Sequence, residues 1–396
     1  MSAARSLPLR MTLLSAIGLL EAMVFGLTHP IYALNLQQQG FSESAIGFNA
    51  TLGGLGVFLV GPFVPWLIAR AGYRNYTVFC FLAAAAAIGA LAAGPGFVGW
   101  CLSRLLLGVA LGSLWILTEA WLNEIVPDTA RGRANAIFQF CYSIGFMAGP
   151  GLVIAVGFAG HLPLAFMVLM ALAGGVATLF LPQPPPAAAG ASHRLDLQVA
   201  REALPLISVA VVTGLVETAL YTMLPIFGQR SGFGERGSLS LLIALSLGAI
   251  SLALPLGLAS DRFDRSRLLF VVAAGALLSM ALLWVGTLSY GVALAASFLA
   301  GGTIIGMYSI SLIILGERYA QRGLASVAAC YSMAYALGST FGGLMGGGSV
   351  ELAGATGLPA LGTAVIGAYV ACRVAGAARR HMTRHRQRNS AQWELT

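Results

Sequence analysis

Long apolar runs alternate with short polar segments along the whole chain. Each run is long enough to cross a hydrocarbon layer about 30 Å thick as an α-helix, which rises about 1.5 Å per residue. The pattern predicts an all-α membrane protein with 12 transmembrane helices. The runs span about 11–34, 44–69, 75–94, 97–122, 133–158, 162–181, 204–228, 238–259, 268–287, 289–315, 324–347 and 354–376.

The segment between the sixth and seventh runs is rich in Pro and Ala and then charged, which is typical of a linker. It divides the chain into two halves of six runs. We expect a six-helix bundle over 1–181, a cytoplasmic linker over 182–203, a second six-helix bundle over 204–378 and a basic cytoplasmic tail over 379–396.

The two halves repeat one another in sequence. GLLEAMVFGLTHPIY (18–32) parallels GLVETALYTMLPIF (214–227), and ARGRANAIFQFCYSIGFMAGPGL (130–152) parallels QRGLASVAACYSMAYALGSTFGGL (321–344). The first pair aligns Glu21 with Glu217, one acid near the middle of each run. Two six-span repeats with acids at matching depth are typical of alternating-access transporters.

Composition and charge narrow the class of protein. The 396 residues are 58% hydrophobic and 9% charged, with a mean hydropathy of +0.84, which excludes an ordinary soluble domain. The net charge of +8 is the balance of 22 Arg against 14 Asp and Glu, and the chain contains no Lys. Of the 22 Arg, 19 fall in alternate connecting segments and the two ends of the chain. By the positive-inside rule both termini are cytoplasmic. We expect a multi-pass protein of the cytoplasmic (inner) membrane, with no nucleic-acid partner and a tail that anchors topology.

Other chemistries lack their motifs. The five Cys lie in apolar runs and are odd in number, so we expect neither a disulfide framework nor a metal site. The first run is too long for a signal peptide and lacks a small-residue cleavage site, so we interpret it as the first span. Neither G-x-x-x-x-G-K-[ST] nor H-E-x-x-H occurs. We therefore expect no enzyme and no cofactor other than a coupling proton.

The segment between the eighth and ninth runs carries the most specific motif. It reads Gly257-Leu-Ala-Ser-Asp261-Arg262-Phe-Asp-Arg265, which resembles the cytoplasmic gate motif Gly-x-x-x-Asp-Arg-x-x-Arg of the major facilitator superfamily. The chain resembles that superfamily over essentially its whole length. The resemblance implies two six-helix bundles that rock about a central substrate site.

The matching segment of the first half departs from the motif. Pro65 replaces its Gly and Ala69 replaces its Asp, ahead of Arg70 and Arg74, so this half of the gate should be weaker. Together with Thr118-Glu119-Ala-Trp121-Leu-Asn123-Glu124 at the end of the fourth run, the pattern is similar to the YcaD-like branch. We expect Glu119, Glu124 and Glu317 to be gate latches that pair with Arg such as Arg70, Arg74 or Arg262.

Two glycine patterns are similar to those of proton-coupled exporters. The fourth run contains Arg104-Leu-Leu-Leu-Gly108-Val-Ala-Leu-Gly112, with a membrane Arg ahead of spaced glycines. The fifth contains Gly145-Phe-Met-Ala-Gly149-Pro150-Gly151, similar to the Gly-x-x-x-Gly-Pro motif of antiporters. We expect the fifth and eleventh runs to be close-contact faces for rocking, with static packing as the alternative; their glycines are Gly145, Gly149, Gly338, Gly342 and Gly346.

An ionisable side chain within a span is a functional-site hypothesis by default. Burial disfavours the charged form of Glu21 and Glu217, so either acid could load and release a proton or bind a cationic solute. The alternative is a permanently protonated acid that is hydrogen-bonded to a neighbouring helix. Arg104 stays charged, and we assign it to modulation of the proton site or to an anionic group, against a structural pair. His29 is a weaker candidate for a proton relay.

The resemblance also places the first and fourth helix of each half around the cavity. We expect a mostly apolar, aromatic substrate pocket with few polar points. Its candidate residues are Phe25, Thr28, Trp115, Thr118, Tyr221, Tyr308 and Ser311. Aromatic residues on membrane helices also serve as packing or interfacial anchors, so each has that alternative.

The sequence therefore predicts a monomeric secondary transporter in the lipid bilayer that exports a small amphiphilic organic solute in exchange for protons. Proton-coupled uptake of a nutrient or siderophore is the alternative within transport. A membrane sensor or assembly factor that transports nothing is the alternative from another class.

Overall fold

The computed structural model describes residues 2–126, 128–158, 160–181, 201–319 and 324–393, and every regular element within them is helical. The first half contains α1 (Ser2–Gln38), α2 (Glu43–Val60), η1 (Gly61–Phe63), α3 (Val64–Ala71), α4 (Tyr73–Gly89), η2 (Ala90–Ala93), α5 (Gly96–Ile125), α6 (Asp128–Val156) and α7 (His161–Leu179). The second contains α9 (Leu204–Arg230), α10 (Gly234–Arg262), α11 (Arg265–Gly286), α12 (Tyr290–Tyr319), α13 (Leu324–Ala353), η3 (Gly354–Thr356) and α14 (Gly357–Trp393).

The all-α prediction is confirmed for the described residues. Eleven candidate membrane spans occur there, and the last, Cys330–Ala375, is 46 residues long. This last stretch contains most of α13, the turn η3 and the start of α14. A helix of 46 residues would be about 69 Å long, more than twice the hydrocarbon thickness. The count of 12 crossings stays a prediction.

The predicted run 44–69 is not one continuous helix. Pro62 lies in the 3₁₀ segment η1 and Pro65 near the start of α3, so the α-helical ladder is interrupted between α2 and α3. Proline lacks a backbone N–H and its ring crowds the carbonyl four residues earlier. Gly72 ends α3 at a φ of 77°, which glycine adopts without a steric penalty.

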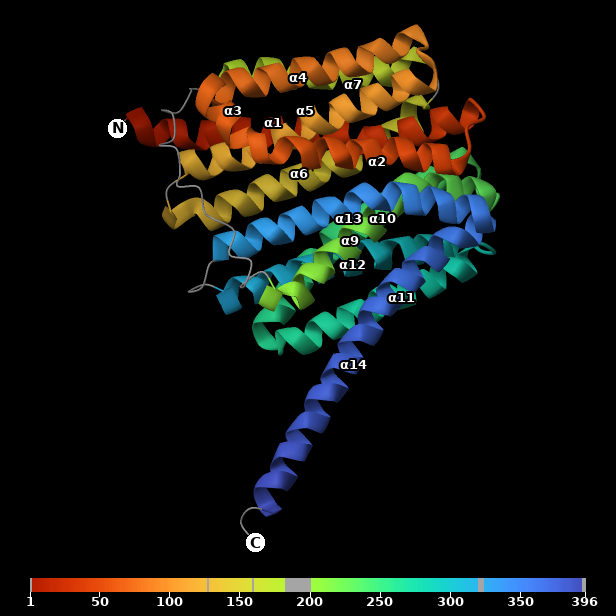
Figure 1. Cartoon of the computed structure of the whole chain (residues 1–396). Helices are drawn as coiled ribbons and strands as arrows, with labels where there is room; N and C mark the ends of the chain where they lie inside the picture. The colour runs from red at the N-terminus through yellow and green to blue at the C-terminus, as the bar shows by residue number, and fades with distance from the viewer. Residues whose placement is uncertain (1, 127, 159, 182–200, 320–323, 394–396) are drawn as a thin grey trace.

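Helices from residues 2–181 lie on one side of the molecule and helices from residues 201–393 on the other (Figure 1). The repeat seen in sequence recurs in the packing, because α1 packs on α6 as α9 packs on α13, and α2 on α5 as α10 on α12. The exact bundle boundaries stay predictions. Most of the predicted linker, residues 182–200, lies outside the described residues.

Glycines of α6 and α13 allow close helix contacts within each half. A Cβ added to Gly149 would lie 2.7 Å from the backbone of α1, and one at Gly214 of α9 would lie 3.0 Å from the nitrogen of Ser339. Gly145 meets the carbonyl of Leu19 in the same way, and Gly338 meets that of Val211. The close contacts predicted for Gly145, Gly149 and Gly338 are therefore present, but they join neighbouring helices of one half.

Other glycines allow close approach between the halves. Gly47 of α2 faces the backbone of Gly343 in α13, and a Cβ there would also lie 3.0 Å from the Cα of Gly347. A Cβ at Gly54 would lie 2.9 Å from the Cα of Thr340. These positions belong to the predicted outer half of both helices. Small residues let helix backbones meet closely, so α2 and α13 close the molecule at this end.

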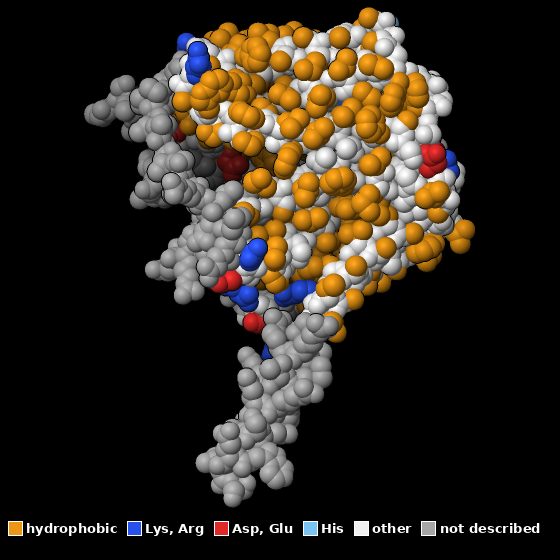
Figure 2. All heavy atoms as spheres, viewed as in Figure 1, with side chains coloured by type: hydrophobic (Ala, Val, Ile, Leu, Met, Phe, Trp, Pro, Cys, Tyr) orange, Lys and Arg blue, Asp and Glu red, His pale blue; other side chains and the backbone are white. Residues whose placement is uncertain are grey.

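The opposite, predicted inner end is open. Figure 2 shows the surface hollowed at the side where α3 lies in Figure 1, with an acidic side chain inside the hollow. α3 packs on α4 and α5 of its own half, and nothing lies within 4 Å of a Cβ added to Gly257 of α10. The two halves thus meet at the predicted outer end and part towards the inner end.

The backbone of α14 continues as a helix to Trp393, well past the predicted span (Figure 1). Side chains beyond residue 375 lie outside the described residues, so the anchoring role of the tail stays a prediction.

Candidate functional site

Glu21 lies near the middle of α1 and is fully buried. Its Oε2 lies 3.3 Å from the hydroxyl of Thr118 on α5. Its Oε1 has no hydrogen-bond partner among the described residues. A buried carboxylate with one oxygen unpaired is costly in an apolar environment, whereas a neutral carboxyl is less so.

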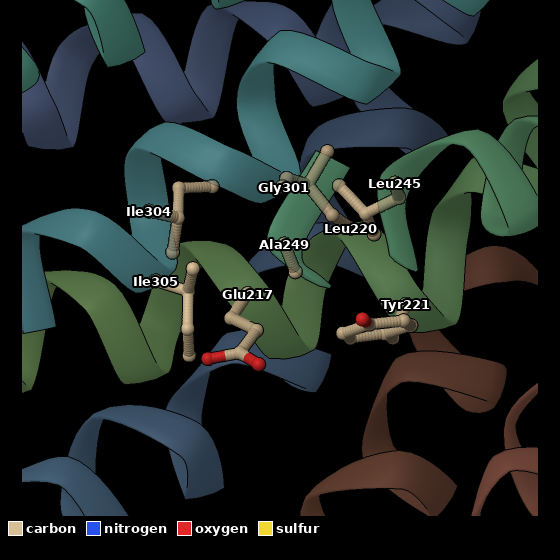
Figure 3. Close-up of a pocket in the computed structure, with 8 residues that line it drawn as sticks. All are labelled: Glu217, Leu220, Tyr221, Leu245, Ala249, Gly301, Ile304 and Ile305. Atoms are coloured by element: carbon tan, nitrogen blue, oxygen red, sulfur yellow. The ribbon is translucent and has the colours of Figure 1, made fainter. Parts of the chain in front are cut away.

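Glu217 occupies the matching place on α9 but has different surroundings. Its side chain is partly exposed, and its Oε2 accepts a hydrogen bond of 2.9 Å from the hydroxyl of Tyr335 on α13. A cavity of about 10 Å³ lies beside it, lined by Glu217, Leu220, Tyr221, Leu245, Ala249, Gly301, Ile304 and Ile305 (Figure 3). That volume is enough for about one water molecule.

Arg104 lies on α5 and is 4% exposed. Its Nη2 is 3.4 Å from Nδ1 of His29, and its guanidinium lies 5.1 Å from the ring centre of Tyr32. Its Nε has no hydrogen-bond partner, and no carboxylate lies within ion-pair distance among the described residues. The structural ion pair considered from the sequence is therefore not seen in the described part, and the nearest titratable neighbour is His29.

Four rings form a layer that joins the two halves, which we call the aromatic roof: Phe25, His29, Phe146 and Tyr221. Tyr221 of α9 lies 5.7 Å from His29 of α1 and 4.9 Å from Phe146 of α6, measured between ring centres. Phe25 lies 5.4 Å from His29. Because His29 and Tyr221 follow the two acids along their helices, the roof lies on the outer side of Glu21 and Glu217.

The predicted substrate residues divide into two groups by accessibility. Thr28, Thr118 and Ser311 are sealed, at 1%, 0% and 0% exposed. The Thr28 hydroxyl donates to the carbonyl of Phe25 at 2.6 Å, and Ser311 lies 2.6 Å from the hydroxyl of Tyr331. These hydroxyls already have partners within the protein, so in this conformation they do not face a solute.

The aromatic residues among the predicted substrate residues are more accessible than these hydroxyls. Phe25, Trp115 and Tyr308 are partly exposed, and Tyr221 is 8% exposed within the aromatic roof. The ring of Tyr308 lies 5.2 Å from those of both Tyr331 and Tyr335. Three of the four aromatic candidates therefore keep part of their surface accessible in this conformation.

The gate motif forms a cluster at the inner end of the second half. Arg265 on α11 makes an ion pair with Glu317 on α12 and approaches Asp261 on α10 at 3.7 Å. Its Nε also donates to the carbonyl of Ser260 at 2.9 Å. Glu317 does pair with an arginine, as expected, but the partner is Arg265 and not Arg70, Arg74 or Arg262. The reason is local, since α11 and α12 pack side by side in one half.

Arg70, in the first-half copy of the gate motif, turns towards its own helix in this conformation. It is exposed, and its guanidinium lies 5.6 Å from the ring centre of Trp66, one helical turn away. Arg262 and Glu119 are exposed, Arg74 is partly buried, and Glu124 is exposed near Tyr73. Their gate role stays a prediction for the conformation that closes the inner end.

Two polar contacts join the halves at the predicted outer end, and the sequence did not predict them. Arg230 at the end of α9 makes an ion pair with Glu43 at the start of α2, and the backbone N–H of Ser44 donates to Glu351 of α13 at 2.8 Å. We call these two contacts the outer latch. In the sequence, Arg230 and Arg236 are the two arginines of the predicted outer loop between the seventh and eighth runs.

Tyr335 and Phe146 were also missed, although the repeat contained the signal. Cys141-Tyr142 aligns with Cys330-Tyr331, and four residues further Phe146 aligns with Tyr335. Both fall on the helix that packs beside an acid-bearing helix. No group of three His, Cys, Asp or Glu that could hold a metal ion occurs among the described residues.

Comparisons with known proteins identify relatives in sequence. An uncharacterized MFS-type transporter of Bacillus subtilis, YfkF, is 24% identical over 334 residues, covering 81% of this chain and 84% of that protein. YcaD of Escherichia coli, also an uncharacterized MFS-type transporter, is 26% identical over 347 residues, covering 84% and 86%.

Solved structures share the fold. The nucleoside transporter NupG superposes with a TM-score of 0.75 at 16% identity, over 93% of this chain and 98% of that one. A D-xylose-proton symporter superposes with a TM-score of 0.74 at 15% identity, over 90% and 95%. A sequence profile of the Major Facilitator Superfamily matches residues 14–376. The chain therefore belongs to the Major Facilitator Superfamily of membrane transporters.

Proposed function

We propose that this protein is a proton-coupled exporter of a small amphiphilic organic solute, working by alternating access in the bacterial inner membrane. In this proposal the chain crosses the membrane 12 times, both termini are cytoplasmic, and the transporter acts as a monomer. The open end is then the cytoplasmic end. The proton is the coupling ion, and no other cofactor and no catalysis are involved.

One observation carries the proposal: two acids lie at matching depth on the equivalent helices α1 and α9, and each contacts a hydroxyl of a neighbouring helix. An acid in a membrane span is expensive unless it serves a proton or ion pathway. A pair related by the internal repeat lies where transporters of this architecture bind their coupling ions.

The hydroxyl of Thr118 supports a proton on Glu21 in this conformation. A threonine hydroxyl has one proton to donate. Its Oγ1 lies 2.8 Å from the carbonyl of Leu114 and 3.3 Å from Oε2 of Glu21. If the shorter contact takes that proton, the longer one is a hydrogen bond only when Glu21 is protonated and donates to Thr118.

The coupling step follows from these contacts. Loss of the proton from Glu21 would leave a buried charge without a cation among its described neighbours, which favours rearrangement of the halves. A charged acid then holds a cationic or polar solute, and a neutral acid favours its release. The switch between conformations is thereby biased by protonation.

Everted membrane vesicles energised by an imposed pH gradient test this proposal by solute accumulation. Wild-type vesicles should accumulate an amphiphilic solute from a panel of organic cations, siderophores and organic acids. Glu21→Gln and Glu217→Gln should abolish gradient-driven accumulation, whereas Glu235→Gln, an exposed acid of α10, should leave it unchanged. Full accumulation in both of the first two variants would show that the proton role is wrong.

Proton-coupled uptake is the second candidate, because the neighbours by fold include proteins named as a nucleoside transporter and a D-xylose-proton symporter. It predicts accumulation in intact cells that carry the protein relative to cells that lack it, the opposite sign to export. A sensor or assembly factor predicts no gradient-driven flux in either direction.

A further inference from the structure

Glu217 and Glu21 differ in what surrounds them, although the repeat makes them equivalent. Glu21 is fully buried, with the hydroxyl of Thr118 on α5 beside it. Glu217 is partly exposed, and its carboxylate accepts the hydroxyl of Tyr335, whose ring lies 5.2 Å from that of Tyr308. Tyr221 lines the same small cavity as Glu217. An acid that is both accessible and ringed by aromatic groups is suited to a ligand as well as to a proton.

The three tyrosines come from three helices, α9, α12 and α13, so the group is held by tertiary packing. Tyr335 donates its hydroxyl to Glu217, which fixes one carboxylate oxygen at 2.9 Å. Tyr308 stands edge-on to Tyr335, with ring centres 5.2 Å apart and planes at 68°. The hydroxyl of Tyr331 donates to the carbonyl of Tyr308 at 2.9 Å and so braces the helix turn that carries Tyr308. We call Glu217, Tyr221, Tyr308 and Tyr335 the tyrosine cage.

The cage has no counter-ion of its own among the described residues. The ion pairs found there involve Glu43, Asp261 and Glu317, and none involves Glu217. The basic pair His29 and Arg104 belongs to the other half; His29 approaches the ring of Tyr221, at 5.7 Å between ring centres, and makes no ion pair with Glu217. The second oxygen of Glu217 therefore remains available for a cation that comes from outside the protein.

The orientation of the Glu217 carboxylate sets the direction from which a ligand would approach the cage. Figure 3 shows the carboxylate of Glu217 pointing away from Leu245 and Gly301, and Tyr221 one turn along the same helix. The cavity of about 10 Å³ beside Glu217 is too small for an organic solute. The aromatic roof closes the outer side, so a ligand reaches the cage from the open, predicted cytoplasmic end.

The chemistry of the cage selects among cations. An inorganic cation such as Ca²⁺ requires six to eight oxygen ligands, and Mg²⁺ requires a near-ideal octahedron. The cage offers one carboxylate, phenol hydroxyls and aromatic rings. Aromatic rings attract organic ammonium groups through their quadrupole, and more strongly once water is removed. A large, weakly hydrated organic cation fits this donor set.

We propose that Glu217, Tyr308, Tyr335 and Tyr221 form the binding site for the cationic group of the substrate, and that the substrate is an organic cation of the quaternary ammonium or phosphonium kind. This inference rests on the proposed transport function. The inference refines that function by giving the two acids different roles: Glu21 carries the proton and Glu217 contacts the solute. A proton on Glu217 competes with the cation, so binding and protonation exclude one another at this residue.

Equilibrium binding to the purified full chain in detergent tests the cage without any gradient. The probe is tetraphenylphosphonium, and the comparison ion is tetraphenylborate, which has nearly the same size and shape but a negative charge. The wild type should bind tetraphenylphosphonium saturably and tetraphenylborate at least tenfold more weakly. Equal saturable binding of the two ions would overturn the proposal, because hydrophobic partition alone would account for it.

Variants then locate the site. Glu217→Gln should weaken tetraphenylphosphonium binding at least tenfold, and Tyr308→Leu about tenfold to thirtyfold, as expected for a desolvated cation and an aromatic ring. Tyr308→Phe keeps the ring and should stay within about threefold of the wild type, which guards against misfolding in the leucine variant. Tyr290→Leu, at the far end of α12, is the matched control. Unchanged affinity in Glu217→Gln would overturn the proposal.

The binding assay and the vesicle assay can contradict the two proposals independently. Binding that depends on Glu217 without pH-driven accumulation would uphold the cage and contradict proton coupling. Accumulation of another solute, with no saturable tetraphenylphosphonium binding, would uphold coupling and contradict the cage.

Discussion

The contact between Gly47 and Gly343 gives a direct way to perturb the closed outer end. In Gly47→Ala the new methyl group would meet the carbonyl of Gly343 and lie 3.0 Å from the Cα of Gly347. These are backbone atoms, which cannot rotate aside as a flexible side chain can. α2 and α13 must therefore separate slightly, and the conformation that parts them at the outer end gains population.

The size of the effect follows from the cost of overpacking. Inserting a methyl group into a well-packed contact typically costs about 1–3 kcal/mol. The strain is present only while the outer end is closed, so it acts as a difference between the two conformations. At about 1.4 kcal/mol per factor of ten, the ratio of outward-open to inward-open protein should rise about 5-fold to 150-fold.

Spin labels at Gln39 and Leu352 would report this ratio as a distance distribution, in a background without the five native cysteines. Both positions are exposed at the outer end. Gly47→Ala should shift population to the longer distance, and Gly343→Ala, which meets Ala50 from the opposite side at 2.8 Å, should do the same. Gly348→Ala is the matched control, since only Ser44 lies near its added Cβ, at 3.9 Å.

An unchanged distribution in both Gly47→Ala and Gly343→Ala, in folded protein, would refute the idea that this contact closes the outer end. A shift of the same size in Gly348→Ala would also refute it, because the effect would then not depend on the close approach.

Three further predictions concern single polar contacts. Arg230→Ala should shift the same label distance by less than Gly47→Ala, since a partly exposed ion pair contributes up to about 1 kcal/mol, and the difference from wild type should shrink at high salt. Thr118→Val should lower pH-driven accumulation while Thr118→Ser retains it, because only the serine keeps a hydroxyl for Glu21; equal activities would contradict that contact. Asp261→Asn should slow accumulation more than Arg70→Gln, and equal, negligible effects would contradict the asymmetric inner gate.

Much of the fold is predictable from the sequence because the bilayer imposes simple rules. Apolar length led to the all-helical architecture, and the internal repeat led to the acids on α1 and α9. The interruption at Pro62 was not predicted, since an apolar run gives no sign of how the ladder continues past two prolines. The missing N–H and the ring of proline, and not hydropathy, set the backbone geometry between α2 and α3.

The site was only partly predictable. A repeat tells which helices are equivalent, and it led to Glu21 and Glu217 together. It does not tell that Thr118 seals one acid and that Tyr335 braces the other, because these contacts depend on the rotation of neighbouring helices. The Glu43–Arg230 ion pair of the outer latch was missed because its partners are far apart in sequence and lie in different halves.

The central claim is that solute movement exchanges for protons through Glu21. The most direct test is the lumenal pH of proteoliposomes, read by a trapped dye while tetraphenylphosphonium is added under an imposed pH gradient. The account predicts a solute-triggered pH change in the wild type and in Glu235→Gln, and none in Glu21→Gln. A pH change of wild-type size in Glu21→Gln would contradict it.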